Sequence, residues 1–283
     1  MTGFAGKRIL ITGAASGIGR ALARIAARKG ASLLITDVRP RELQRTAEEL
    51  LLEGARVLDV RAFDISDFEA TREFAHRVHE RHGSVDILVN NAGIAVWGAV
   101  EHMTHADWRK VIDVNLMGPI HLIEAFLPMT IAAGRGGHLV NVSSAAGLFG
   151  LPWHAAYSAS KFGVRGLSEV LRFDLEKHGI RVSLVCPGGV NTGLVDSVKV
   201  LGADATSDGY KRLRERFQRH AITPELAAAR IVNGVEKNRY YVYTSSDIAV
   251  GHWFQRKFAW PYEFVMRRLN RSFDGAMAEG RVA

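Results

Sequence analysis

The sequence predicts an α/β fold with a single doubly wound parallel sheet of about seven strands and helices on both faces. Short apolar segments alternate with longer amphipathic segments along most of the chain. Several apolar segments end in glycine, asparagine, aspartate or serine. Such alternation requires right-handed crossover connections, which produce a parallel sheet. Ligands bind these sheets beyond the carboxyl ends of the strands, so we expect function at the polar strand ends.

The composition is that of an ordinary globular protein, because 47% of the 283 residues are hydrophobic and 23% are charged. No internal repeat or linker divides the chain, so we expect one domain over residues 1–245 and a C-terminal extension over 246–283. No apolar run approaches the roughly 18 residues that a membrane span needs. The single cysteine, Cys186, forms no internal disulfide. With no signal peptide recognised, a cytoplasmic location is expected. No Cys/His cluster has zinc spacing, so no metal is expected.

The net charge is +8. The basic residues are spread along the chain and are most frequent at 211–219 and 256–271. We therefore expect no nucleic acid partner. Attraction of an anionic cofactor or of a membrane surface explains the charge equally well.

The first strand and the turn after it indicate a nucleotide site. We expect a buried strand over 7–12, the turn Gly13-Ala-Ala-Ser-Gly17-Ile-Gly19, and a helix over 20–29. Glycines let the backbone approach a pyrophosphate, and a helix N-terminus offers it free N–H groups. This succession is that of a Rossmann-type dinucleotide unit, although its G-x-x-x-G-x-G spacing differs from the common fingerprint.

The second strand, expected over 31–36, ends at Asp37. A carboxylate here accepts hydrogen bonds from the adenosine ribose and repels a 2′-phosphate, which favours NAD over NADP. Arg39 and Arg41 follow closely and would weaken that preference. The alternative for Asp37 is a cap for the helix that starts at Pro40.

The same alternation continues toward the C-terminus. Further helices are expected over 40–53, 67–82, 104–133, 157–177 and 223–237, and further strands over 56–62, 85–89, 138–142, 180–186 and 240–244. The polar strand ends are Asp64-Ile65, Asn90-Asn91-Ala92-Gly93, Ser143-Ser144 and Pro187 to Thr192. The polar segment 193–220 is expected to be a mobile excursion with one basic helix.

Tyr157 and Lys161 lie four residues apart on an expected helix, so they share one face. An ammonium beside a phenol favours the phenolate, and we expect the pKa of Tyr157 below its ordinary value of about 10. Such a tyrosine exchanges a proton readily with a reacting oxygen. A surface lysine above a half-buried tyrosine has the same spacing, so the pair gains weight only from the other motifs.

Six motifs in order resemble those of the short-chain dehydrogenase/reductase family over roughly residues 5–245. They are Thr12-Gly13-x-x-x-Gly17-Ile18-Gly19, Asn90-Asn91-Ala92-Gly93, Asn115, Ser144, Tyr157-x-x-x-Lys161 and Pro187-Gly188. The resemblance implies an oxidoreductase that transfers a hydride to or from a nicotinamide cofactor, NAD or, less favoured by Asp37, NADP. The cofactor carries that chemistry, while the protein positions a carbonyl and supplies a proton. We also expect a homodimer or homotetramer.

The resemblance assigns roles to individual residues. Tyr157 is the general acid/base, and Lys161 lowers its pKa and holds the nicotinamide ribose. Ser144, thirteen residues before the tyrosine as in the family, binds the substrate oxygen, and Asn115 holds a water that relays protons. The implied cofactor contacts are Gly13, Ser16, Gly17, Ile18 and Gly19 at the pyrophosphate, Asp37, Asp64 and Ile65 at the adenosine, and Asn91, Ala92, Gly93, Pro187, Gly188, Val190 and Thr192 toward the nicotinamide end, beside Tyr157 and Lys161.

Residues next to these positions are mostly apolar or aromatic. The expected lining of the substrate site is Ile94, Ala95, Val96, Trp97, Leu148, Phe149, Trp153 and parts of 193–220. We therefore expect a bulky hydrophobic secondary alcohol or ketone, which is steroid-, retinoid- or lipid-like. His154 is interpreted as pocket-lining or solvated rather than as a base.

The extension interleaves aromatic and basic residues between 253 and 271. This pattern suits a lid over the substrate site, a subunit interface, or an interfacial helix at a membrane surface. Two other functions stay open: an NADP(H)-dependent carbonyl reductase of the same family, and a non-catalytic dinucleotide-binding scaffold or redox sensor. A scaffold would be free to lose Asn115, Ser144, Tyr157 or Lys161, and all four are present.

Overall fold

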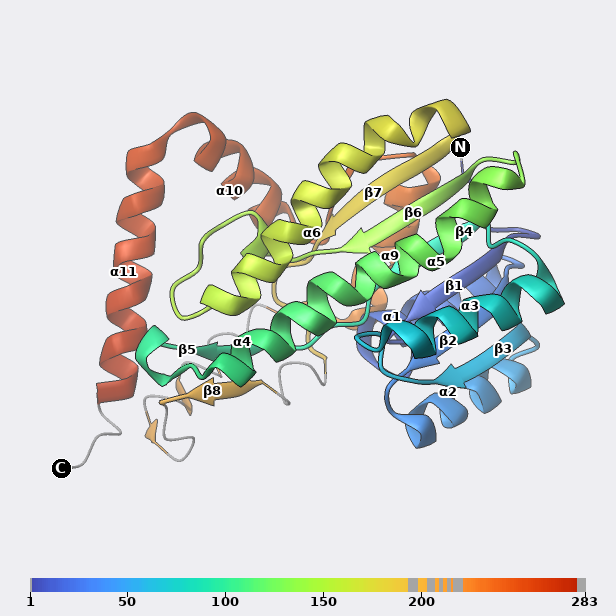
Figure 1. The fold of residues 1–283 in the computed structure, drawn as a ribbon. Helices are drawn as coiled ribbons and strands as arrows, with labels where there is room; N and C mark the ends of the chain where they lie inside the picture. Colours follow the sequence, from blue (N-terminus) through green and yellow to red (C-terminus); the bar gives the residue numbers. More distant parts are fainter. Residues whose placement is uncertain are drawn as a thin grey trace.

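The computed structural model describes residues 2–192, 198–202, 207–208, 211–212, 215 and 221–278. Seven parallel strands form one sheet in the order β3-β2-β1-β4-β6-β7-β9, with helices on both faces (Figure 1). The strand order runs outward in both directions from the centre, which is the doubly wound arrangement. The predicted parallel α/β sheet is therefore confirmed.

The main sheet is built from short, mostly apolar segments. Its strands are β1 (Arg8–Thr12), β2 (Ser32–Asp37), β3 (Arg56–Ala62), β4 (Ile87–Asn90), β6 (Gly137–Val142), β7 (Ile180–Cys186) and β9 (Tyr241–Tyr243). Successive side chains of a strand point to opposite faces. Ile9 and Ile11 accordingly enter one core, while Leu10 between them enters the other. All three are fully buried, as a sheet covered on both faces requires.

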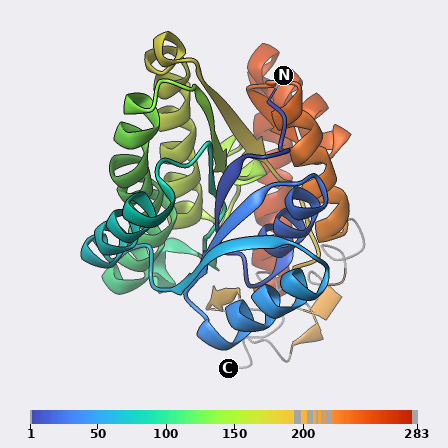
Figure 2. The ribbon, with the colours of Figure 1, turned by 90° about the vertical axis from the view of Figure 1, so that its right-hand side faces the viewer.

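Two layers of helices cover the sheet (Figure 2). One core lies under α1 (Gly17–Arg28), α2 (Pro40–Leu52) and α9 (Pro224–Glu236). The other lies under α3 (Phe68–His82), α5 (Gly118–Ala132) and α6 (Ala155–Asp174). Short 3-10 turns occur at η1 (Val100–His102), η3 (Ala145–Gly147) and η4 (Glu176–His178).

The helix expected over 104–133 forms, but it is not uniformly α-helical. α4 (His105–Ile112) passes into a π-helical turn, η2 (Asp113–Met117), which continues into α5. Asn115 lies in the π turn with its side chain fully buried. Turns of this kind occur frequently at functional sites.

Taken as one element, His105–Ala132 is long and apolar enough to cross a membrane by length and composition. The expectation that no apolar run approaches this length is therefore wrong. However, Leu122 and Phe126 are fully buried in the core beneath α3. We assign the element as a core helix of the α/β domain.

A second, two-stranded sheet lies beside the carboxyl edge of the main sheet. β5 (Val96–Gly98) pairs in parallel with β8 (Lys199–Leu201). The segment 193–220 therefore contains a strand, which corrects its prediction as a mobile excursion. The basic helix expected in this segment lies mainly outside the described residues.

The C-terminal extension forms two helices, α10 (Ser246–Lys257) and α11 (Ala259–Ala278). α11 stands at the end of the molecule where β5 and α4 lie (Figure 1). The hydroxyl of Tyr262 accepts a hydrogen bond from the backbone N–H of Gly150 at 2.8 Å. Near its other end, the indole of Trp153 donates to Asp274 at 3.1 Å. Two hydrogen bonds thus tie α11 to the loop between β6 and α6.

Candidate active site

The predicted functional residues gather at one edge of the main sheet. Gly13, Asp37, Asn91 and Ser144 follow or end β1, β2, β4 and β6. Because these strands are parallel, their carboxyl ends meet at the same edge. The structure therefore brings the glycine turn, Asp37 and the hydroxyl groups of Ser144 and Tyr157 into one region.

The turn after β1 requires its glycines. Gly13 and Gly17 have φ angles of +67° and +53°, in the left-handed region that side chains disfavour. A Cβ on Gly19 would lie 2.1 Å from the carbonyl oxygen of Gly13. A Cβ on Gly13 would lie 2.9 Å from the Cα of Ala92. The turn is packed so closely that no side chain fits at these positions.

The start of α1 offers an anion site next to this turn. Ser16 is the N-cap residue, but its side chain makes no capping hydrogen bond, and the first turn contains no acidic residue. Free N–H groups and the positive end of the helix dipole therefore face the turn. Ile18 packs against the core below and fixes the helix to the sheet. This arrangement fits the pyrophosphate of a dinucleotide.

Thr12 holds the glycine turn against the loop after β4. Its hydroxyl accepts hydrogen bonds from the backbone N–H groups of Asn91 and Ala92, both at 3.0 Å. The side-chain amide of Asn91 donates to the Thr12 carbonyl at 2.9 Å. Asn91 thus braces the turn through its side chain. Sequence reasoning gave Thr12 no role; a threonine ending a buried strand was the available signal.

Asp37 is buried at the end of β2 and is held from two sides. Its carboxylate accepts the backbone N–H of Ala15 at 3.1 Å and forms an ion pair with Arg39 at 3.0 Å. The guanidinium of Arg39 also donates to the hydroxyl of Ser16 at 2.8 Å. The N-cap of α2 is Arg39 itself, so the alternative of Asp37 as that cap is wrong.

Asp64 and Ile65 follow β3 on the same edge. The carboxylate of Asp64 accepts hydrogen bonds from the backbone N–H and the hydroxyl of Ser66, at 2.9 and 2.7 Å. Ile65 is buried against the start of α5, where a Cβ on Gly118 would lie 2.6 Å from its Cδ1. Asp64 thus shapes its own turn, while the carbonyl oxygen of Ile65 lies 3.0 Å from Nδ1 of His121.

The loop after β7 closes the other side of the cofactor region. The carbonyl of Pro187 accepts the backbone N–H of Ala145 at 2.7 Å, and Gly188 lies close to the side chain of Ile248 in α10. Val190 pairs with Ile222 in an isolated bridge. Further along this loop, the methyl group of Thr192 lies close to Gly17, where an added Cβ would be only 3.0 Å from it. The loop therefore reaches across to the glycine turn.

Tyr157, Lys161 and Ser144 form a buried polar group. Tyr157 and Lys161 lie one turn apart on α6 and are only 8% and 4% exposed. The hydroxyl of Ser144 accepts the backbone N–H of Ala146 at 3.1 Å and interacts with the phenol of Tyr157, whose pKa it lowers. The ammonium of Lys161 donates to the carbonyl of Val142 at 3.0 Å and lies 5.8 Å from the centre of the Tyr157 ring. Two hydroxyl groups thus converge, with a cation over the phenol ring.

The adjacent Ser143 has a different role. Its hydroxyl donates to the backbone carbonyl of Lys161 at 2.9 Å and fastens α6 to the end of β6. A Cβ on Gly147 would lie 2.2 Å from this hydroxyl. Of the two serines, Ser144 is the one that interacts with Tyr157, and its catalytic role stays a prediction.

Asn115 connects the π turn to the loop after β4. Its side-chain oxygen accepts the backbone N–H of Ile94 at 2.8 Å, and its amide donates to the Ile94 carbonyl at 2.9 Å and to Ser160 at 3.2 Å. A Cβ on Gly93 would lie 3.1 Å from the Asn115 oxygen and 3.4 Å from Nζ of Lys161. Gly93 thus leaves the space in which Asn115 and Lys161 approach each other.

Burial controls the proton affinities of this group. Desolvation raises the pKa of Tyr157, and the hydrogen bond with Ser144 opposes the rise. Desolvation also lowers the pKa of Lys161 to about 8. The expected lowering of the Tyr157 pKa by Lys161 is therefore wrong for this arrangement. The ammonium is bound to the Val142 carbonyl, and the loss of water around the phenolate dominates.

A group of aromatic side chains, with His154 at its centre, lies next to Tyr157. The ring of His154 lies 4.6 Å from that of Trp97, 6.4 Å from that of Tyr157 and 6.2 Å from that of Phe273. Trp153 stacks on Phe273 at 6.1 Å, and its backbone has the unusual φ of +64°. Sequence reasoning missed Phe273, because nothing local indicates that α11 returns to this region.

The predicted lining residues divide between two apolar clusters. Ile94, Ala95, Val96 and Trp97 share a cluster with Tyr157. Leu148 and Phe149 instead belong to a cluster that includes residues of α10 and α11. The place of Leu148 and Phe149 in the lining of the substrate site therefore stays a prediction. They support the extension, because the short η3 turn directs them toward it.

His154 is buried, and its protonation state is well defined. Nδ1 lies 2.6 Å from the carbonyl oxygen of Pro152, so Nδ1 carries the hydrogen. Burial lowers the pKa of His154 to about 4. A neutral imidazole beside Tyr157 agrees with the interpretation of a pocket-lining residue.

Comparison with known proteins agrees with this geometry. The family model of the short chain dehydrogenases matches residues 7–200. The oxidoreductase SadH of Mycobacterium tuberculosis is 40% identical over 243 residues, which cover 84% of this chain and 86% of that protein. The C alpha-dehydrogenase of Sphingobium sp. is 33% identical, over 89% of this chain and 84% of its own.

Solved structures show the same relationship. A short-chain dehydrogenase/reductase from Burkholderia phymatum, in complex with NAD, matches with a TM-score of 0.80 and 31% identity, over 91% of this chain and 95% of its own. A metagenomic short-chain oxidoreductase in complex with NADP matches with a TM-score of 0.62 and 40% identity, over 67% and 85%. The glycine turn, Asp37, Ser144 and Tyr157 thus belong to an NAD(P)-dependent oxidoreductase, and the chain is a member of the short-chain dehydrogenase/reductase family.

Proposed function

We propose that the protein transfers a hydride between NAD(H) and a bulky hydrophobic secondary alcohol or its ketone. Asn115, Ser144, Tyr157 and Lys161 are the proposed catalytic residues. The observation that carries the proposal is that the side chains of Ser144 and Tyr157 interact, beside the buried Lys161, at the sheet edge where the glycine turn lies. A scaffold without catalysis has no use for two hydroxyls aimed at one point.

The two hydroxyls suit a reaction at a carbonyl oxygen. Both donate to that oxygen during reduction, and negative charge that develops on it is stabilised by donors already in place. Tyr157 then gives its proton to the oxygen, and in alcohol oxidation the phenolate takes a proton back. The bound nicotinamide supplies the hydride chemistry. Lys161, with its pKa near 8, keeps a positive charge by the phenol ring at neutral pH.

The proton lost by Tyr157 has to be replaced from solvent. Both N–H groups of the Asn115 amide and one lone pair of its oxygen are already engaged with Ile94 and Ser160. We therefore infer that the relay water is held by main-chain groups of the π turn, and that the amide fixes the shape of that turn.

Asp37 supports a preference for NAD, because a 2′-phosphate would meet its buried negative charge. We expect Asp37→Ala to raise the Kd for NADH about tenfold, since hydrogen bonds to charged groups contribute about 1.5–3 kcal/mol. Affinity for NADPH should be unchanged or higher. Fluorescence titration with both nucleotides measures this.

Arg39→Gln is the matched variant, because Arg39 is the cation that neutralises Asp37. It should retain NADH binding and weaken NADPH binding. A wild-type preference for NADPH, or an equal loss of both nucleotides in Asp37→Ala, would contradict the assignment.

The substrate class follows from the aromatic residues around Tyr157. Trp97, His154 and Phe273 offer flat, largely apolar surfaces rather than the donors that a sugar needs. A relative from Sinomonas cyclohexanicum, 38% identical over 68% of this chain and 76% of its own, is named trans-4-hydroxycyclohexanecarboxylate dehydrogenase. The compound in that name carries its hydroxyl group on a six-membered ring, which supports a cyclic alcohol as the substrate of this protein.

We further propose that α11 is a lid over this site in the same chain. Phe273 stacks on Trp153 and contacts His154, while hydrogen bonds at Gly150 and Asp274 fix the helix. Of the three alternatives for the extension, the lid is the one that these contacts support.

A substrate panel tests the function and the lid together. Wild type should oxidise cyclic and aryl secondary alcohols with NAD and leave polyols unchanged. Phe273→Ala should raise KM for the bulky alcohols about tenfold, because one hydrophobic contact contributes roughly 1–3 kcal/mol to selection. Phe254→Ala is the control, since Phe254 is an exposed aromatic residue of α10. Turnover of polyols alone, or equal effects of both variants, would contradict the proposal.

The outer face of α10 and α11 keeps large aromatic side chains in solvent, among them Trp253, Trp260 and Phe264. Contiguous exposed apolar residues usually mark a contact surface. We propose that this face joins two copies of the chain in a cytoplasmic homodimer or homotetramer. Peripheral membrane contact is the alternative, and sedimentation with liposomes distinguishes the two.

A further inference from the structure

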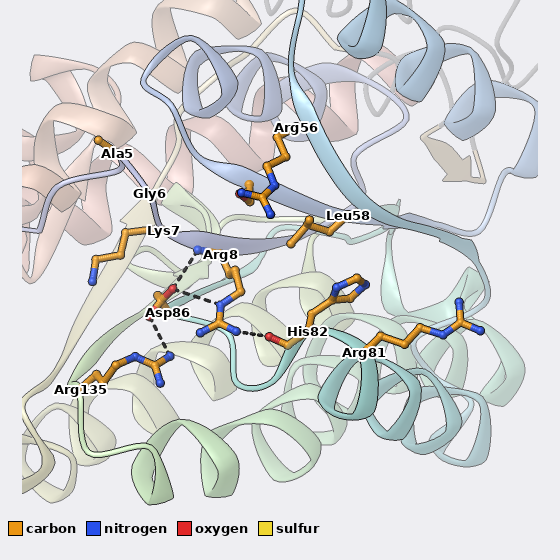
Figure 3. A pocket seen from close by; sticks show the side chains of 11 residues that line it. Ala5, Gly6, Lys7, Arg8, Arg56, Leu58, Arg81, His82, Asp86 and Arg135 are labelled. Atoms are coloured by element: carbon orange, nitrogen blue, oxygen red, sulfur yellow. Dashed lines mark hydrogen bonds and ion pairs between the residues drawn. The ribbon is translucent and has the colours of Figure 1, made fainter.

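A cavity of about 530 Å³ lies at the edge of the sheet opposite the candidate active site (Figure 3). Its lining residues precede or begin strands: Lys7 and Arg8 at β1, Arg56 at β3, Asp86 before β4, and Arg135 before β6. The active-site residues follow the same parallel strands, so the two regions are separated by the length of the sheet. The proposed reaction makes no use of this cavity.

The cavity has a strong excess of positive charge. Five of its lining residues are cationic and one is anionic, an excess of four with His82 counted as neutral. Besides the four cations at the strand starts, Arg81 contributes from the last turn of α3. Like charges that gather around one hollow repel each other, because a partly enclosed space is less screened than open water.

The single carboxylate is already fully engaged. Asp86 accepts the backbone N–H of Arg8 at 2.9 Å and the guanidinium of Arg135 at 3.2 Å. The Arg8 guanidinium lies 3.7 Å from the same carboxylate and also donates to the carbonyl of His82. Asp86 therefore holds two guanidinium groups in position, as the dashed lines in Figure 3 show.

Three cations of the cavity lack such a partner. Within the described part of the chain, no carboxylate lies within 4.0 Å of Lys7, Arg56 or Arg81. Figure 3 shows the guanidinium of Arg56 directed toward Arg8 across the hollow. Cations on a simple solvated face would be free to turn away from each other.

Neighbouring cations of the same fold are paired. The arginines of α1 form ion pairs with Glu49 and Glu53 on α2. On the same strand as Arg56, Asp59 pairs with Arg77 at 2.6 Å. Other cations, such as Arg61 on β3, also have no ion pair among the described residues, so what distinguishes the cavity is that its unpaired cations gather around one hollow.

We propose that this cavity binds a small polyphosphorylated anion, for which pyrophosphate is the minimal ligand. Planar guanidinium groups bind phosphate oxygens through paired hydrogen bonds, and Arg8 and Arg135 are held ready for that purpose. Lys7, Arg56 and Arg81 supply charge that no carboxylate of the described residues offsets. The volume exceeds that of one phosphate group, and Leu58 is the principal apolar side chain of the lining, so the phosphates are the recognised part.

Isothermal titration with inorganic pyrophosphate at low salt, with NADH saturating the glycine turn, tests this proposal. Wild type should bind pyrophosphate, and Arg56→Gln should weaken the binding about tenfold. Arg56 is exposed at the start of β3, so its replacement leaves the core intact, and circular dichroism checks this. Arg268→Gln removes an equal charge from exposed α11 and should bind as wild type does.

The outcomes separate specific binding from general attraction. No binding by wild type, or equal binding by Arg56→Gln, overturns the proposal, and so does an equal loss in Arg268→Gln. A parallel titration with ADP identifies the source of the phosphates. Equal affinity assigns recognition to the phosphate chain alone, whereas tighter binding of ADP identifies a nucleotide as the ligand.

Discussion

Tyr157→Phe is expected to bind NADH as the wild type does and to lose about a thousandfold in kcat. The substitution removes one buried oxygen and keeps the ring that packs beside Trp97 and His154. What disappears is the proton donor, and general acid–base catalysis contributes typically about 10²–10⁴-fold. Stopped-flow reduction of a cyclic ketone gives kcat, and fluorescence titration gives the NADH affinity.

The paired serines provide the control for this experiment. Ser144→Ala should lower kcat about a hundredfold, because it removes the second donor to the substrate oxygen. Ser143→Ala should instead lower the free energy of unfolding by about 1–2 kcal/mol, because it leaves the Lys161 carbonyl without its partner. Its kcat should fall much less. Full activity in Tyr157→Phe, or equal kinetic effects of the two serine variants, would exclude the proposed chemistry.

The parts of the site that the sequence predicts are those with local signals. Gly13 and Gly17 require left-handed backbone, and Asp37 ends a buried strand, so each is recognisable within a few residues. Because the sheet is parallel, its carboxyl edge brings these strand ends together, and no additional signal in the sequence is needed to predict this. Ser144 and Tyr157 meet for the same reason, since one ends β6 and the other lies in the following helix.

The π turn is not recognisable in the sequence. The periodicity over 104–133 is helical throughout, and one additional residue in a turn hardly alters it. The turn depends on Asn115 bonding the backbone of Ile94 on a separate loop. The pairing of Trp97 in β5 with Val200 in β8 is equally non-local. A strand of three residues is also too short to show the alternation of apolar and polar residues that identifies a strand in a sequence.

Two other features depend on tertiary contacts of long range. The aromatic and basic pattern of the extension fits a lid, an interface or a membrane surface. Hydrogen bonds between residues 112 and 121 positions apart, at Tyr262 and at Asp274, place α11 beside the site. The sign of the Tyr157 pKa shift likewise follows from burial, which the spacing to Lys161 does not reveal.

Gly19→Ala is expected to abolish NADH binding, with at least a hundredfold rise in Kd. The added methyl group would lie 2.1 Å from the Gly13 carbonyl oxygen and 2.6 Å from the side-chain amide of Asn91. Real carbon atoms do not approach so closely, so the turn has to move. The turn has little room to move, because the backbone of Ala92 already lies against its other side. A Cβ built on Gly13 would be only 2.9 Å from the Cα of Ala92. The displaced atoms belong to the surface that receives the pyrophosphate.

Gly166→Ala is the matched control on α6. Apart from the adjacent residues and the backbone of α6 itself, no heavy atom of the described residues lies within 4 Å of the position that its methyl group would take. This variant should bind NADH normally and gain about 0.5–1 kcal/mol in stability, since alanine favours a helix over glycine by that amount. For Gly19→Ala, overpacking should lower stability by about 1–3 kcal/mol, so the chain still folds. Isothermal titration and thermal unfolding of both variants separate lost binding from lost folding. A Gly19→Ala protein that binds NADH tightly would show that the pyrophosphate does not lie on this turn.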